Sequence, residues 1–139
     1  MNTIVSLLVS GFLLFCATGT EALAGPNEDI IAAAKLGDKA AVETAINNGA
    51  SVNAFDPLAM PGETTALGIA AANGHENVAK SLLDHGANVS GRDGLQLTPL
   101  HMAADHGNHS VAKLLLAHAA DVNARDFLGA TPLHYAATG

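Results

Sequence analysis

The sequence has few of the side chains that usually build a large core. Of its 139 residues only 4% are aromatic, with one Tyr and no Trp, although 49% are apolar. The core must therefore consist of Ala, Leu, Val and Ile, and small side chains fill space only when the elements approach closely. The length is enough for one small domain.

Basic residues and cysteine are also scarce. Lys and Arg number 6 against 13 Asp and Glu, which gives a formal net charge of −7. Binding to nucleic-acid phosphates or to an anionic membrane surface requires clustered Lys and Arg, so the composition argues against both kinds of partner. The single Cys cannot form an internal disulfide, and a metal site built from several Cys is excluded.

The first 24 residues have the pattern of a targeting signal. Residues 4–15 are nearly all apolar, but this run is too short to span a bilayer as a helix. Ala22 and Ala24 then place small residues at the −3 and −1 positions, which is the pattern that signal peptidase accepts. We predict a signal peptide over residues 1–24, cleaved before Gly25, and a protein that is exported to the periplasm or secreted.

The same segment has alternative interpretations. No Lys or Arg precedes the apolar run, so an uncleaved anchor and a buried N-terminal helix stay open. Lipid attachment at Cys16 is disfavoured, because Phe15 is large where a small residue is expected. Cleavage after Ala24 removes the only thiol, which suits an oxidising compartment, and leaves no segment for stable membrane insertion.

The rest of the chain repeats with a period of 33 residues. Thr98-Pro99-Leu100-His101 recurs as Thr131-Pro132-Leu133-His134, and a degraded copy, Thr65-Ala66-Leu67-Gly68, lies one period earlier. Gly74-His75 corresponds in the same way to Gly107-Asn108. The period indicates a chain built from stacked copies of one structural unit.

A second repeated feature is an Arg-Asp pair, present as Arg92-Asp93 and Arg125-Asp126. Asp93 is followed by the next Thr five residues later, whereas Asp56 is nine residues before Thr65. Four extra residues therefore lie within 57–63, and we expect one elongated loop there.

Together these motifs resemble the ankyrin repeat, and the match covers nearly all of residues 27–139. The resemblance implies an all-α fold, a solenoid of helix-turn-helix units with β-turn fingers, containing about three repeats and a partial fourth. It implies an N-terminal capping repeat with an elongated finger at 25–63, repeats at 64–96 and 97–129, and a partial repeat at 130–139 that has the first helix only.

The local chemistry agrees with this pattern. Thr98 and Thr131 can cap helices through their hydroxyls, and a Pro follows each of them at the first helical position. Gly86 closes a second helix, and Ala119 stands at the matching place, which is unfavourable if that backbone is left-handed. The residues expected to face inward from the second helices are Val78, Leu82, Leu83, Val111, Leu115 and Leu116.

The two ends of the repeat array differ. Polar residues 27–29 suit a terminal cap, one face of which meets water. The chain stops at Gly139, one residue before the position that matches Gly107, so we expect Leu133 and Tyr135 to be partly uncovered. The favoured interpretation is a fragment or truncated reading frame, and the alternatives are a fraying end or cover by a partner.

We find no pattern typical of catalysis or metal binding. His101, His106 and His109 do not share one helical face, and His75 is not followed by a His four residues later. The sequence contains no nucleophile elbow and no glycine-rich phosphate loop. The resemblance implies that His101 and His134 bind loop backbone near the preceding Thr. We therefore predict no catalytic residue, no cofactor and no metal.

In the ankyrin family, proteins are bound by the finger tips and by the concave side of the first helices. Apolar tips beside Arg are typical of binding hot spots, although packing of Leu95, Leu97 and Leu128 between fingers is an open alternative. We predict a monomeric, non-enzymatic protein that binds a protein partner outside the cytoplasm; the alternative is an exported effector that binds host proteins. The candidate partner-binding residues are Phe55, Leu58, Met60, Arg92, Leu95, Asp105, His106, Arg125, Phe127 and Leu128.

Overall fold

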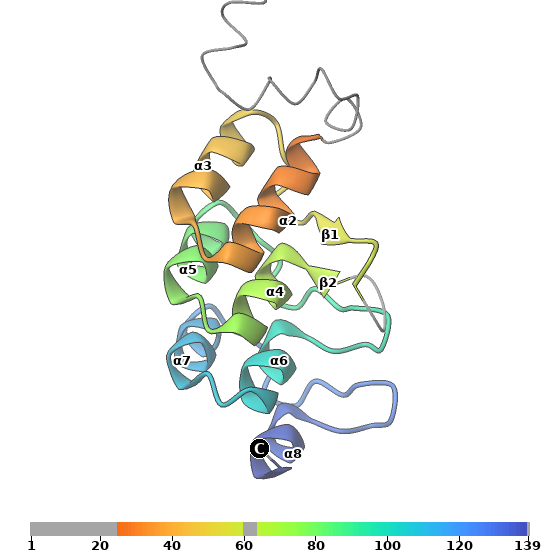
Figure 1. The fold of residues 1–139 in the computed structure, drawn as a ribbon. Coiled ribbons are helices and arrows are strands. Elements are labelled where there is room, and N and C mark those ends of the chain that lie inside the picture. The colour runs from red at the N-terminus through yellow and green to blue at the C-terminus, as the bar shows by residue number, and fades with distance from the viewer. Residues whose placement is uncertain (1–24, 60–63, 139) are drawn as a thin grey trace, which may run out of the picture.

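The computed structural model describes residues 25–59 and 64–138, so the predicted signal peptide and the candidate Met60 lie outside the described residues. The described part contains seven short helices, most of them joined in helix-turn-helix pairs (Figure 1). The helices are α2 (Pro26–Leu36), α3 (Lys39–Asn47), α4 (Ala66–Asn73), α5 (Glu76–Asp84), α6 (Pro99–Asp105), α7 (His109–Ala117) and α8 (Pro132–Thr138).

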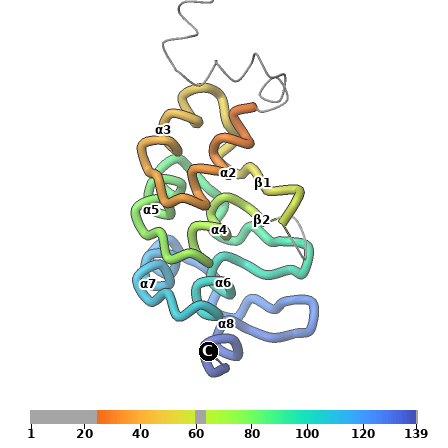
Figure 2. The backbone as a smooth tube through the Cα atoms, viewed as in Figure 1, coloured from red at the N-terminus to blue at the C-terminus, as the bar shows by residue number. Residues whose placement is uncertain are grey.

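The helices stack in two layers (Figures 1 and 2). Helices α2, α4, α6 and α8 contact one another in that order and lie beside the fingers, while α3, α5 and α7 form the layer behind them. Ile30, Leu67, Leu82 and Leu115 are fully buried between the layers. The first helices carry buried alanines, including Ala34, Ala70, Ala71 and Ala103, which allow these helices to approach closely. The predicted all-α solenoid is confirmed.

Contacts between repeats hold the ends of the first helices. The imidazole Nε2 of His75 lies 3.2 Å from the carbonyl oxygen of Lys35. At the matching place, the Asn108 side-chain amide donates to the last carbonyls of α4 at 2.7 and 2.8 Å. Gly37 and Gly74 face these side chains with positive φ, and a Cβ on either would lie within 2.8 Å of them. Glycine is therefore needed there for both backbone conformation and space.

Two expectations about the last repeats have different outcomes. Leu116 was expected to face inward like Leu83, and this is wrong: Leu116 is 43% exposed and Leu83 only 8%. The reason is that α5 lies between α3 and α7, whereas α7 is the last second helix among the described residues. Leu133 is 76% exposed and Tyr135 half-buried, as the partial repeat predicted.

Three loops project from the first-helix layer (Figure 1), and we name them finger 1 (residues 51–59 and 64–65), finger 2 (88–97) and finger 3 (121–130). The elongated finger 1 contains two short antiparallel strands, β1 (Phe55–Asp56) and β2 (Thr64–Thr65), which the sequence did not predict. Fingers 2 and 3 are closed by tighter turns, in which the Asp93 and Asp126 N–H groups donate across the turn at 3.0 and 2.9 Å.

Ala119 provides a test of backbone strain in the fold. Its φ is +65°, and the equivalent Gly86 has φ +87° with no neighbouring atom within 4 Å of the place that a Cβ would occupy. We expect Ala119→Gly to raise the free energy of unfolding by about 0.5–1 kcal/mol, since a left-handed alanine costs more than the entropy that glycine adds to the unfolded chain. Urea unfolding of the repeat region measures the change.

The reciprocal substitution is the control. Gly86→Ala should lower the free energy of unfolding by about 1 kcal/mol, because the methyl group meets no steric obstacle and only the backbone conformation is penalised. Equal signs for the two substitutions would contradict this account.

Candidate protein-binding face

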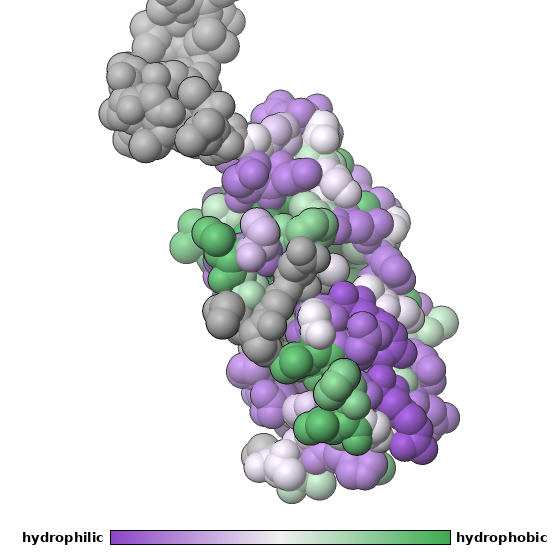
Figure 3. Space-filling model, turned by 90° about the vertical axis from the view of Figure 1, so that its right-hand side faces the viewer, coloured by the Kyte–Doolittle hydropathy of each residue, from purple (hydrophilic) through white to green (hydrophobic). Residues whose placement is uncertain are grey.

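The finger tips expose large apolar side chains. The exposed fraction is 48% for Phe55, 39% for Leu95 and 76% for Phe127, and it reaches 85% for both Leu58 and Leu128. Figure 3 looks onto the finger side and shows hydrophobic surface gathered over part of it, beside strongly hydrophilic surface. Exposed apolar side chains of this size contribute little to the stability of the fold itself. A row of them on the finger tips is therefore a candidate surface for burial against a partner.

The finger backbone is held by one aspartate in each finger. An Oδ1 oxygen accepts from backbone N–H groups two and four residues later, at 2.8 Å, in both Asp93 and Asp126. Asp56 Oδ1 accepts from the N–H two residues later at 2.9 Å. These bonds close the turns, so the tips are presented on an ordered backbone. The sequence showed the repeated Arg-Asp pair but not this role.

The two candidate arginines make bonds within and between fingers. Arg92 Nη1 donates to the Gln96 carbonyl at 2.9 Å and to the Arg125 carbonyl at 2.7 Å, which ties finger 2 to finger 3. Arg125 Nη1 donates to the Gly129 carbonyl at 3.0 Å. The Phe127 N–H also donates to the Leu95 carbonyl at 3.0 Å. Both guanidinium groups thus support the finger backbone while remaining on the exposed surface.

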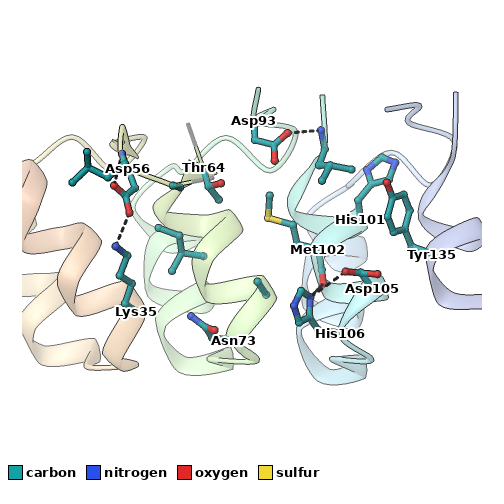
Figure 4. A pocket seen from close by; sticks show the side chains of 15 residues that line it. Lys35, Asp56, Thr64, Asn73, Asp93, His101, Met102, Asp105, His106 and Tyr135 are labelled. Carbon is teal, nitrogen blue, oxygen red and sulfur yellow. Dashed lines mark hydrogen bonds and ion pairs between the residues drawn. The ribbon is translucent and has the colours of Figure 1, made fainter. Parts of the chain in front are cut away.

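A cavity of about 420 Å³ lies between fingers 1 and 2 and the first-helix layer (Figure 4). We call it the finger groove. Three candidate residues, Leu58, Asp105 and His106, line it. Ala72 and Leu97 also line it, together with residues that sequence reasoning did not assign to a binding site: Lys35 and Asp56, which form an ion pair, and the residues Ile69, Asp93, His101, Met102 and Tyr135. The candidates therefore form two surfaces, the exposed tips and this groove.

Electrostatics in the groove are set by its ion pair. The Lys35 ammonium donates to Asp56 Oδ2, and this contact, with the Leu58 N–H on the other oxygen, holds the pKa of the Asp56 carboxyl below its usual range. Asp105 lies next to His106, whose Nδ1–H donates to the Met102 carbonyl at 3.0 Å. The carboxylates of the groove therefore outnumber its cationic side chains.

His101 is fully buried and occupied by hydrogen bonds of the fold. Its Nδ1 accepts from the Thr98 N–H at 3.1 Å, so the proton lies on Nε2, which donates to the Ala130 carbonyl at 3.1 Å. The imidazole therefore joins the start of α6 to the end of finger 3, in the role that the resemblance implied. Both ring nitrogens are used by the protein.

The Tyr135 hydroxyl donates to Asp126 Oδ2 at 2.7 Å, and its ring meets the His101 ring edge to face at 5.5 Å. The hydrogen bond to the carboxylate, followed by burial and nearby negative charge, raises the pKa of Tyr135 to about 12. The same bond, with the backbone N–H groups, lowers the pKa of Asp126. This contact joins α8 to finger 3.

Other kinds of site were sought over residues 25–59 and 64–138. Those ranges hold no group of three or more His, Cys, Asp and Glu side chains placed to bind a metal ion. None of the helices within them has the length and apolar character needed to cross a bilayer. The chemistry that the described surface offers is hydrophobic contact at the tips and hydrogen bonding to carboxylates in the groove.

Stacked helix pairs with projecting fingers define the chain as a repeat-built scaffold that presents a continuous face. A family model for ankyrin repeats (3 copies) matches residues 4–93, 30–126 and 92–139. The chain belongs to the ankyrin-repeat family, whose members are typically non-enzymatic modules of protein–protein interaction. A search among curated proteins finds no match to the chain.

Tyr135 gives a direct test of the finger 3 geometry, because it is the only tyrosine in the chain. Ultraviolet titration of the phenol should give a midpoint at about 12, well above the usual value of 10.0. Since the folded pKa is raised, the stabilisation by this bond is complete below pH 10 and is lost as the pH rises through 12.

The matched variants are Asp126→Asn and, on α5, Asp84→Asn. Asp126→Asn should move the Tyr135 midpoint back toward about 10, the value of a free tyrosine, whereas Asp84→Asn should leave it in place. An unchanged midpoint in Asp126→Asn would show that the Asp126 contact does not raise the pKa.

Proposed function

We propose that this protein is a non-enzymatic, monomeric binding protein that acts outside the cytoplasm and holds a protein partner against its fingers and groove. The observation that carries the proposal is the row of exposed apolar side chains on three successive fingers. Phe127 and Leu128 are the clearest members, with exposed fractions of 76% and 85%. Aromatic and aliphatic anchors of this kind supply most of the energy in protein interfaces.

The way the tips are held favours binding. Phe127 and Leu128 lie in a turn whose backbone is fixed by Asp126, and the Phe127 N–H is bonded to finger 2. A preorganised loop loses little conformational entropy when a partner covers it, so more of the hydrophobic gain is retained as affinity. The candidate tips Phe55 and Leu58 extend this surface onto finger 1.

An extracytoplasmic location is supported by the sequence of the first 24 residues, in which a short apolar run precedes small residues at the cleavage positions. It is also consistent with the position of the only Cys, which a cleaved signal would remove. We propose that the protein is exported to a bacterial periplasm or secreted, and that the ankyrin repeats begin close after Gly25.

The binding surface is tested by capture from the cells that make the protein. Tagged protein that carries both Phe55→Ala and Phe127→Ala should lose a partner that the parent retains, because the two substitutions remove aromatic contact area from fingers 1 and 3. Quantitative mass spectrometry of the captured proteins measures the loss. Hot-spot truncations of this kind weaken binding by about 2 kcal/mol or more each.

The control carries Leu36→Ala and Leu116→Ala. Both side chains are exposed, at 79% and 43%, but they lie on α2 and α7 rather than on the fingers. Capture that is equal in all three proteins, or lost equally in the two double variants, would contradict the assignment of the finger tips.

Export is tested on the N-terminus of the protein purified from the extracytoplasmic fraction. Intact mass should correspond to a chain beginning at Gly25, because Ala24 occupies the cleavage position. Ala24→Arg should block processing and leave the full-length chain with the cells, since signal peptidase requires a small residue there. Full-length protein in the cytoplasmic fraction of the parent would contradict this proposal while leaving the binding surface untouched.

A further inference from the structure

We propose that the finger groove receives an arginine side chain of the protein partner, whose guanidinium donates to Asp93 Oδ2. The proposal rests on the proposed function, because it identifies a chemical feature of the partner. It is carried by a comparison among the three finger aspartates, which occupy equivalent positions and differ in one contact.

In all three aspartates Oδ1 is used by the turn of the finger. The second oxygen of Asp56 is bound by the Lys35 ammonium from α2, and that of Asp126 by the Tyr135 hydroxyl from α8 at 2.7 Å. Asp93 differs: over residues 25–59 and 64–138 no side chain or backbone group donates to its Oδ2. Asp93 is nevertheless only 6% exposed. A buried carboxylate oxygen without a protein donor is costly unless a ligand or solvent satisfies it.

The repeat explains why the first helices on either side of finger 2 supply no donor to Asp93. The position that matches Tyr135, one period earlier, is Met102. The position that matches Lys35, in the register that aligns Gly37 with Gly74, is Ala72. Neither side chain can donate a hydrogen bond, and both line the finger groove. At the place where the other two fingers have a donor from a first helix, the described lining of the groove has only Ala72 and Met102.

Figure 4 shows the geometry of this opening. One Asp93 oxygen is directed to finger 2, and the other points into the groove on the side of Met102. Ile69 and Leu97 supply apolar wall, and Asp105 lies at the other end. A ligand that fits has an apolar stem and a cationic head that carries hydrogen-bond donors.

Charge and hydration favour arginine. Lys35 is the one Lys or Arg among the described residues that line the groove, and it is paired with Asp56, so neither Asp93 nor Asp105 is paired there with a Lys or Arg. A guanidinium is more weakly hydrated than an ammonium, and its removal from water into a groove with apolar walls is less costly. Its planar donors also form charge-assisted hydrogen bonds with carboxylates.

The test uses two blocked tripeptides, Gly-Arg-Gly and Gly-citrulline-Gly, which differ in charge but hardly in shape. Each is titrated into the purified, exported protein while the backbone amide signals of Leu95 and Leu97 are followed by NMR, since these groups donate to the other oxygen of Asp93. The arginine peptide should shift both signals and bind about tenfold more tightly than the citrulline peptide.

Three variants locate the site. Asp93→Asn keeps an oxygen for the turn but replaces Oδ2, and should weaken the arginine peptide about tenfold. Met102→Tyr copies the fourth repeat and should abolish binding by giving Asp93 an internal donor. Asp84→Asn removes an equal charge from α5, outside the groove lining, and should leave the affinity of the arginine peptide within about twofold of the parent, because an exposed surface charge is largely screened by salt.

Equal binding of the two peptides, unchanged affinity in Asp93→Asn, or no arginine binding up to about 10 mM would overturn the proposal. If Asp93→Asn fails to fold, the peptide comparison on the parent and Met102→Tyr still decide. Failure of the proposed function is seen separately: capture that depends on Phe55 and Phe127 without arginine binding leaves the tips valid and rejects the groove. Arginine binding that depends on Asp93, without any captured partner, does the reverse.

Discussion

In each finger, one oxygen of an aspartate accepts hydrogen bonds from the backbone N–H groups of the turn that follows it. The donors to Asp93 and Asp126 lie at 2.8 Å, and the donor to Asp56 at 2.9 Å. A short turn has few contacts of its own, so its conformation depends on these bonds. Both parts of the proposed binding face depend on these bonds too, because the bonds set the direction of the apolar tips and of the second aspartate oxygen.

The repeats differ in the partner of the second oxygen, Oδ2, of the finger aspartate. A solenoid is stabilised by contacts between neighbours, and identical repeats would give each aspartate the same partner. In this chain α2 supplies Lys35 to Asp56, α8 supplies Tyr135 to Asp126, and the equivalent positions facing Asp93 hold Ala72 and Met102. The backbone conformation is thus repeated, while the side chains that face the finger aspartates are not. Changes at these positions can alter which partners fit without changing the fold.

Much of the fold could be predicted from the sequence because its determinants are local or recur at a fixed period. The capping Thr98, the glycines after the first helices and the buried Leu82 and Leu115 all follow from that pattern. Leu116 was predicted wrongly because its burial depends on whether another helix of the same layer covers α7, not on its own helix, and α5 is the one such neighbour among the described residues. Local periodicity places a residue on a face but does not say whether that face is covered.

The candidate site could be predicted only in part, for a related reason. Exposed tips such as Phe127 follow from their position in the repeat, and the structure places Phe127 on the surface. The Arg92 contact with finger 3 and the Tyr135 contact with Asp126 join residues of different elements, so no local pattern reveals them. The strand pair of finger 1 was missed because an insertion has no counterpart in the other repeats to compare with.

The two parts of the proposed binding face are expected to contribute in different ways. Apolar tips give affinity in proportion to the area that a partner covers, and many partners with a hydrophobic surface can satisfy them. A buried carboxylate oxygen is selective, because a partner that covers it without a donor leaves it desolvated and unsatisfied, which costs about 1–3 kcal/mol or more for a charged group. In the proposed binding face, Asp93 is therefore expected to discriminate against wrong partners at least as much as it attracts the right one, and the fingers that carry Phe55 and Phe127 are expected to determine how strongly an accepted partner is held.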